Sequence, residues 1–247
     1  LWELGNRYFD QGQYEQALKV YQKSLIAYKG STNNEADVLR DMGNTYYEMK
    51  QNSQALELYG RSLTAYQTAN NSIQQAYVFR AIARTHHQLK DANSAIKFYL
   101  QALAIFRKEL PKFKEKRHQY ADALTLWELG NRYFDQDQYE QALKVYQESL
   151  IAYKGSVKDE AWVLLSMSNT YKQLDQLEKA SKAYQQALEN AQVSVQAETA
   201  VFEDSDRQRD SNQIVPHQNR LEAALNIVGE WQISQGTETS GQPHTGI

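Results

Sequence analysis

The chain has 247 residues, 41% of them hydrophobic, and a formal net charge of −3 at pH 7, so it has no global basic signature for nucleic acid. It contains no cysteine, which excludes disulfides and thiolate chemistry. The mean hydropathy is −0.73, and the sequence lacks an apolar run of about 18 residues, so we expect no membrane-spanning segment. Because disulfides persist in oxidising compartments, the missing cysteines favour a cytoplasmic location.

One pattern recurs five times along the chain, and each copy opens on an apolar residue. The copies begin at Leu1, Leu39, Phe79, Leu126 and Leu164. A small residue follows at Gly5, Gly43, Ala83, Gly130 and Ser168, and a tyrosine recurs at Tyr21, Tyr59, Tyr99, Tyr146 and Tyr184. Apolar residues at three- and four-residue steps predict amphipathic helices. Such helix pairs bury their stripes by stacking on their neighbours.

In chain order, this periodicity predicts ten helices. They are expected near 1–11, 14–29, 34–49, 52–69, 72–89, 92–110, 112–136, 139–154, 158–174 and 177–197. They pair into helix–turn–helix repeats near 1–33, 34–71, 72–117, 118–156 and 157–197. The polar, aperiodic residues 198–216 predict a flexible linker. Helical spacing returns over 217–235 as a capping helix, and 236–247 is expected to be a disordered tail.

The pattern of an apolar residue, Leu-Gly, Tyr, Ala and Tyr at fixed offsets resembles the tetratricopeptide repeat family. The resemblance covers roughly residues 1–197. It implies an all-α fold, a right-handed superhelical solenoid of five such repeats with a C-terminal capping helix. Gly5 and Gly43 are 38 residues apart, which exceeds the usual period of about 34. This spacing is similar to the long repeats of kinesin light chains and GoLoco-motif adaptors.

Two repeats are nearly identical. Residues 1–31 and 126–156 differ only at Gly12/Asp137 and Lys23/Glu148, from which we infer recent copying of one repeat. The chain also opens at the first apolar position of a repeat, without the polar cap that usually protects the end of a solenoid. We therefore expect it to be a piece of a longer protein.

The resemblance implies that the first helices of the repeats line a concave groove in which a partner docks. The exposed position after the small residue is Asn6, Asn44, Arg84, Asn131 and Asn169. Amides offer both donors and acceptors, so such a row can bind the main chain of an extended peptide. The alternative is that asparagine follows the family's common Gly-Asn pattern and only makes local contacts.

Aromatic residues and arginine, the usual anchors of interfaces, lie beside this row. They are Trp2, Arg40, Arg80 and Trp127 on one side and Phe9, Tyr47, His87 and Phe134 on the other. The arginines predict a positive middle of the groove, which suits an acidic or phosphorylated segment. For Phe9 and Phe134, packing between repeats is an equally good interpretation.

One well-known subgroup of the family binds the acidic tails of chaperones through a lysine/asparagine clamp, and this sequence departs from it. Trp2 replaces the first clamp lysine, and Asp41 replaces the asparagine of the second repeat. Tyr77 and Ala81 replace the basic pair of the third repeat. Only Asn6 fits, which argues against a chaperone-tail receptor.

No catalytic residues, metal site or cofactor is predicted, because the sequence has no HExxH spacing, no glycine-rich phosphate loop and no G-x-S-x-G element. The sequence therefore indicates a non-catalytic scaffold that binds a peptide or protein segment. Three alternatives stay open: a peptide-sensing regulator, nucleic-acid binding through the basic run 107–118, and the regulatory arm of a larger enzyme. Nucleic acid is the less favoured partner, no membrane partner is expected, and the oligomeric state is left open.

Overall fold

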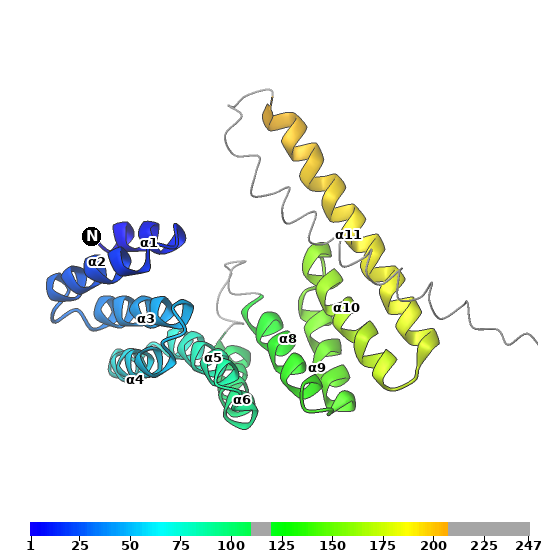
Figure 1. Cartoon of the computed structure of the whole chain (residues 1–247), viewed down its shortest axis with the longest axis horizontal. Helices are drawn as coiled ribbons and strands as arrows, with labels where there is room; N and C mark the ends of the chain where they lie inside the picture. The colour runs from blue at the N-terminus through cyan, green and yellow to red at the C-terminus, as the bar shows by residue number, and fades with distance from the viewer. Residues whose placement is uncertain (110–119, 207–247) are drawn as a thin grey trace, which may run out of the picture. The chain divides into compact units, whose positions relative to one another are not determined.

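The computed structural model describes the backbone of residues 1–109 and 120–206 and the side chains of residues 1–109 and 120–194 (Figure 1). Every regular element within these residues is a helix, which confirms the predicted all-α class. The helices are α1 (Trp2–Asp10), α2 (Tyr14–Ala27), α3 (Thr32–Glu48), α4 (Asn52–Thr68), α5 (Ser72–Gln88), α6 (Ala92–Glu109), α8 (Ala121–Phe134), α9 (Tyr139–Ala152), α10 (Val157–Gln173) and α11 (Leu177–Asp206). The chain forms two compact units, Leu1–Leu188 and Glu189–Ile247, and the repeats lie in the first.

The helices of the first unit pack mainly on their neighbours in sequence. The two helices of a repeat pack against each other, as α3 does against α4 (Figure 1). The second helix of one repeat then contacts the first helix of the next, as α4 contacts α5 and α6 contacts α8. The first helices of consecutive repeats also touch, because α1 contacts α3, α3 contacts α5, and α8 contacts α10. This arrangement is the stacking of a helical solenoid, and it places first helices side by side.

The small residue of the pattern lets a tyrosine ring cross the first helix at very close range. A Cβ atom on Gly43 would lie 2.6 Å from Cε1 of Tyr59, and one on Gly130 would lie 2.4 Å from Cε1 of Tyr146. Both tyrosines are 1% exposed, so their rings have no room to retreat. Glycine at this position therefore sets the close approach of the two helices in a repeat.

The turn between the two helices of each repeat contains one residue in the left-handed conformation. These residues are Gly12, Lys50, Lys90, Asp137 and Asp175, with φ between 56° and 71°. The two nearly identical repeats have different residues at this position, Gly12 in one and Asp137 in the other. Both residues adopt the same left-handed conformation. Left-handed backbone carries little penalty for glycine and a larger one for aspartate, so this substitution acts on the turn and leaves the helix faces unchanged.

The helix boundaries agree with the predictions to within two residues except at two places. The helix expected from 112 begins at Ala121, and residues 110–119, which include Pro111 and most of the basic run 107–118, lie outside the described residues. The last helix, α11, continues to Asp206 and not to 197, so residues 198–206 of the predicted linker are helical. No proline or glycine interrupts the sequence between Leu177 and Pro216, which explains the extension. The rest of the linker, the capping helix at 217–235 and the tail at 236–247 lie outside the described residues.

Candidate functional site

Three of the four predicted asparagines are held by a tyrosine of the second helix in the same repeat. Tyr21 Oη donates to Asn6 Oδ1 over 2.7 Å, Tyr59 Oη to Asn44 Oδ1 over 2.8 Å, and Tyr146 Oη to Asn131 Oδ1 over 2.6 Å. Burial raises the pKa of all three tyrosines, so their hydroxyls remain protonated donors. The amide oxygens are thus occupied inside each repeat. Asn44 Nδ2 also donates to Asp41 Oδ1 over 3.5 Å. An amide nitrogen carries two N–H donors, so Asn44 keeps one of them for a ligand.

In the third repeat, Arg84 takes the place of asparagine. Its guanidinium carbon lies 4.9 Å from the centroid of the Tyr47 ring, and its Nε lies 3.8 Å from Oε1 of Glu128. The side chain remains 42% exposed, so the guanidinium can still reach a ligand. Because an arginine donates and never accepts, the row at these positions presents hydrogen-bond donors.

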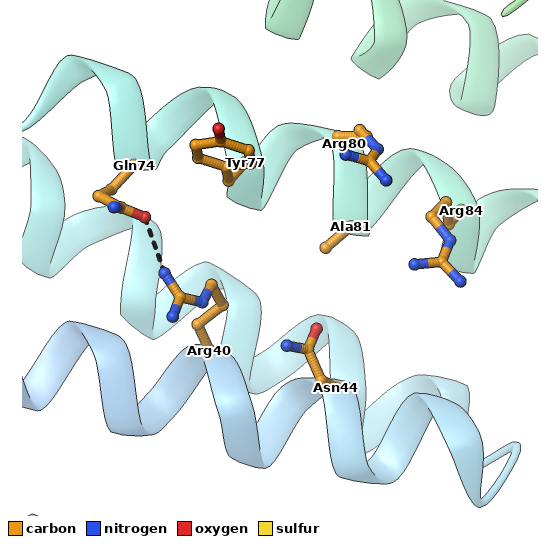
Figure 2. Close-up of a pocket in the computed structure, with 7 residues that line it drawn as sticks. All are labelled: Arg40, Asn44, Gln74, Tyr77, Arg80, Ala81 and Arg84. Atoms are coloured by element: carbon orange, nitrogen blue, oxygen red, sulfur yellow. Dashed lines mark hydrogen bonds between the residues drawn. The ribbon is translucent and has the colours of Figure 1, made fainter. Parts of the chain in front are cut away.

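Two adjoining hollows lie along the first helices. The α1–α3 hollow has a volume of about 350 Å³ and is lined by Trp2, Asn6, Phe9, Asp10, Tyr21, Arg40, Asp41 and Asn44. The α3–α5 hollow has a volume of about 430 Å³ and is lined by Arg40, Asn44, Gln74, Tyr77, Arg80, Ala81 and Arg84. Figure 2 shows Arg40 and Asn44 reaching from α3, and Arg84 from α5, into this second hollow. We call the surface that holds both hollows the first-helix face.

Arg40 is the centre of a polar network between the two hollows. Its guanidinium pairs with Asp37 at 3.1 Å and Asp41 at 3.2 Å, and its Nη1 donates to Gln74 Oε1 over 2.7 Å (Figure 2). The hydroxyl of Tyr66 accepts from Arg40 over 3.0 Å and donates to Asp37 over 2.6 Å. Two carboxylates surround this one cation, so the charge of Arg40 is offset locally.

Asp41 also accepts from the indole of the first repeat, since Trp2 Nε1 lies 2.8 Å from Asp41 Oδ2. Burial disfavours the ionised carboxyl and raises the pKa of Asp41, although Arg40 and the Trp2 indole pull it back. The edge of Trp2 is therefore committed to the contact between repeats, and its remaining surface lines the α1–α3 hollow.

Arg80, which lies beside the row, is paired with Glu128 of α8 over 2.8 Å. Arg84 shares the same carboxylate at longer range. The positive middle predicted from Arg40, Arg80 and Arg84 is thus reduced, because Asp37, Asp41 and Glu128 stand against the three guanidinium groups. Arg40 faces two carboxylates, whereas Arg80 and Arg84 on α5 share one. Of these three arginines, those on α5 therefore keep an excess of positive charge.

Other predicted residues lie away from the two hollows. Trp127 packs beside the core cluster of the fourth repeat, and its Nε1 donates to Ser166 Oγ over 2.9 Å. The His87 ring contacts the Arg132 guanidinium, and burial together with that cation lowers the pKa of His87. Asn169 is exposed on α10. Trp127, His87, Asn131 and Asn169 therefore line neither of the two hollows.

The phenylalanines of the predicted groove pack within their repeats. Phe9 lies 5.7 Å from Tyr14, and Phe134 lies 5.5 Å from Tyr139, measured between ring centroids. Both also pack against core clusters. Packing is thus a main role of both rings, and Phe9 in addition lines the α1–α3 hollow.

The sequence did not predict as site residues the polar side chains that line the hollows or pair with their arginines: Asp10, Asp37, Asp41, Gln74 and Glu128. Asp37 could have been found, since it precedes Arg40 by one helical turn. Glu128 carried no such signal, because it belongs to a different repeat from Arg80.

Trp2 and Trp127 occupy equivalent positions in the two nearly identical repeats, so the same substitution can be compared at both. We expect Trp2→Phe to destabilise its repeat about twice as much as Trp127→Phe, because Trp2 donates to a carboxylate and Trp127 to a neutral hydroxyl. Hydrogen exchange resolved by segment is the appropriate measurement, since repeat arrays open locally. Equal losses in the two segments would contradict a role for the acceptor's charge.

A family model described as tetratricopeptide repeat matches residues 1–68 and 121–192, and a second model with the same description matches residues 80–109. The chain belongs to the tetratricopeptide repeat family. Members of this family generally serve as non-catalytic protein-interaction modules. No curated protein sequence matches the chain.

Solved structures with the same architecture include proteins of several kinds. BtubC (BKLC) from P. vanneervenii has a TM-score of 0.68 at 16% identity, covering 77% of this chain and 78% of that one. A structure of nearly identical TPR-like repeats of a kinesin light chain from Podosopora anserina has a TM-score of 0.62 at 14% identity. The match covers 85% of this chain and 95% of that one. Aspartyl phosphate phosphatase F from Bacillus subtilis has a TM-score of 0.68 at 16% identity, covering 95% and 60%. These similarities establish the fold, including its likeness to kinesin light chain-type repeats.

Among residues 1–109 and 120–206, no helix is long and apolar enough to cross a membrane. Within the same described part of the chain, no group of three or more His, Asp or Glu side chains could hold a metal ion.

Proposed function

We propose that the chain is a non-catalytic interaction module that binds an extended segment of a partner protein across the first-helix face. The observation that carries this proposal is the pair of hollows that share Arg40 and Asn44. Together they follow the contact of α1 with α3 and of α3 with α5, so one segment can occupy both. We further propose that the module acts in the cytoplasm, in keeping with its cysteine-free sequence.

The proposed segment is recognised in part through its main-chain carbonyl groups. Because Tyr21 and Tyr59 occupy the oxygens of Asn6 and Asn44, both amides can present N–H donors to the hollows. Asn44 has one such donor to offer, since its other N–H reaches Asp41 Oδ1 over 3.5 Å. Carbonyl oxygens recur on every residue of an extended chain and need no particular side chain. Donors at fixed positions would therefore hold the segment while the hollows select its side chains.

The α3–α5 hollow is the proposed position for an acidic or phosphorylated side chain. None of the described side chains that line it is acidic, and three of them carry a guanidinium. Arg84 is the most accessible of the three, with 42% of its side chain exposed against 20% for Arg40 and 18% for Arg80. Charge-assisted hydrogen bonds from a guanidinium to a carboxylate or phosphate are the strongest that such a surface offers.

Selection of peptides from a random displayed library tests the proposal, with the parent chain and the double variant Asn6→Asp, Asn44→Asp as baits. Aspartate keeps an oxygen for each tyrosine hydroxyl but removes the Nδ2 donors. We expect peptides enriched on the parent to bind the variant about tenfold more weakly or not at all, since each hydrogen bond contributes about 0.5–1.5 kcal/mol.

Asn34→Asp is the control, because Asn34 is exposed on α3 and lines neither hollow. It adds a negative charge without touching the row, and it should retain the parent's peptides. If the double variant binds the same peptides as tightly as the control does, the asparagines have no part in binding and the proposal is wrong.

A further inference from the structure

We infer that the first-helix face is charge-polarised, and that it selects a segment carrying a basic group over the α1–α3 hollow and an acidic group over the α3–α5 hollow. This inference rests on the proposed function and adds the chemical character of the partner. It follows from how the charged side chains divide between the two hollows.

The α1–α3 hollow is acidic. Asp10 and Asp41 line it, and Arg40 is its one cationic lining residue. Arg40 already faces two carboxylates, those of Asp37 and Asp41. Together with Asp10, three carboxylates stand against one guanidinium, so this region carries an excess of negative charge. Asp10 is exposed, and none of the ion pairs between described residues includes it. A carboxylate so placed is ready to pair with a ligand cation.

Aromatic rings strengthen the preference for a cation on this side. Trp2 and Phe9 line the same hollow as Asp10. The faces of such rings attract ammonium and guanidinium groups, and the methylene stem of lysine or arginine packs well against them. A basic side chain matches a hollow that offers both rings and carboxylate.

The α5 side of the α3–α5 hollow has the opposite sign. Arg80 and Arg84 share the single carboxylate of Glu128, which leaves one positive charge in excess. Glu128 does not line the hollow, whereas both arginines do. Arg84 is the more exposed of the two, so it is the residue best placed to meet an acidic group.

The order of the two charges follows from the order of the helices. Because α3 contacts both α1 and α5, and its Arg40 and Asn44 line both hollows, the acidic and basic regions lie on opposite sides of α3. A segment with two acidic groups would meet Asp10, and one with two basic groups would meet Arg84. Like-charge contacts of this kind reject wrong partners more strongly than matched contacts improve binding.

Blocked synthetic peptides in a serine-alanine background provide the test. Each peptide carries two charged residues, lysine–glutamate in either order, glutamate–glutamate or lysine–lysine, and their separation varies in single-residue steps. The pooled peptides are captured on the full chain and quantified by mass spectrometry. We expect the mixed-charge peptides at a narrow range of separations to be enriched about tenfold, or ~1.4 kcal/mol, over both like-charge sets.

Charge-reversal variants then identify which hollow reads which charge. With Arg84→Glu the preference should move to lysine–lysine peptides, and with Asp10→Lys it should move to glutamate–glutamate peptides. Arg61→Glu and Glu57→Lys, both exposed on α4, are the controls and should keep the parent's preference. Should Arg84→Glu fail to fold, Arg84→Gln should reduce the preference for lysine–glutamate peptides over lysine–lysine peptides.

The outcomes separate this inference from the proposed function. If glutamate–glutamate peptides bind the parent as well as mixed peptides do, the polarity is wrong while the α3–α5 hollow still binds an acid. Preferences that survive both charge reversals also overturn it. If neither this set nor the random library yields any peptide that binds the parent, the proposed function itself is wrong.

Discussion

Arg40→Met is expected to lower the free energy of unfolding by about 3 kcal/mol, because it removes the cation from two partly buried carboxylates. Asp37 and Asp41 have side chains only 22% and 15% exposed, so water replaces the guanidinium poorly. Methionine keeps most of the aliphatic packing of the arginine stem. The measurement is the urea-unfolding midpoint, with Arg61→Met on the exposed face of α4 as the control.

The loss should depend on pH in a defined direction. Burial raises the pKa of Asp41 above its ordinary value of 3.8, so the folded state binds this proton more tightly than the unfolded state. The ionised carboxyl therefore costs stability above the raised pKa, and the cost disappears as the pH falls through it towards 3.8. Arg40 lowers this pKa, so its removal raises the pKa further.

The effect of Arg40→Met is consequently expected to be largest at neutral pH and clearly smaller at an acidic pH, where protonation of Asp41 relieves the unpaired charge. The wild-type chain and the Arg61→Met control are measured at both values, because other groups also titrate. A loss of the same size at both pH values would show that Arg40 contributes by packing and not by its charge.

Gly43→Val is expected to cost about 2 kcal/mol or more, because its Cβ would lie 2.6 Å from the buried ring of Tyr59. Valine is the sharper choice over alanine, since Ala83 already occupies the equivalent position of the third repeat and is buried there. The two γ-carbons of valine extend the overlap beyond what a small backbone shift can absorb. Urea unfolding followed by circular dichroism measures the loss.

Gly60→Ala is the matched control, because Gly60 is also helical but a Cβ there would meet nothing within 4 Å. We expect it to stabilise the chain by about 0.5–1 kcal/mol, the usual gain when alanine replaces glycine inside a helix. The two glycines therefore predict shifts of opposite sign. A stabilising Gly43→Val would contradict the close ring packing that defines the repeat.

The sequence alone determined the repeat and its helix pairs, because both depend on local periodicity. The predicted helices at 34–49 and 72–89 correspond to α3 (Thr32–Glu48) and α5 (Ser72–Gln88). The small residue and the tyrosine sixteen positions later mark the crossing of the two helices, as Gly43 and Tyr59 show. What local pattern predicted less well was the end of α11, where helix propensity continued through residues that looked like a linker.

For the candidate site, the sequence predicted a set of partner-binding residues, and their role in binding stays a prediction. Asn6, Asn44, Arg40, Arg80 and Arg84 do line the two hollows. The sequence did not reveal that a tyrosine holds each of the first two amides, although the spacing of 15 residues recurs in both repeats.

Tertiary structure decided the charge pattern of the face. Trp2 reaches Asp41 across 39 residues, and Arg80 reaches Glu128 across 48. Such contacts depend on how consecutive repeats stack and on which side chains then meet, and a repeating pattern carries no record of either. The sequence predicted which residues bind a partner, and only the packing of α1, α3, α5 and α8 showed which of their charges are paired with a neighbouring carboxylate.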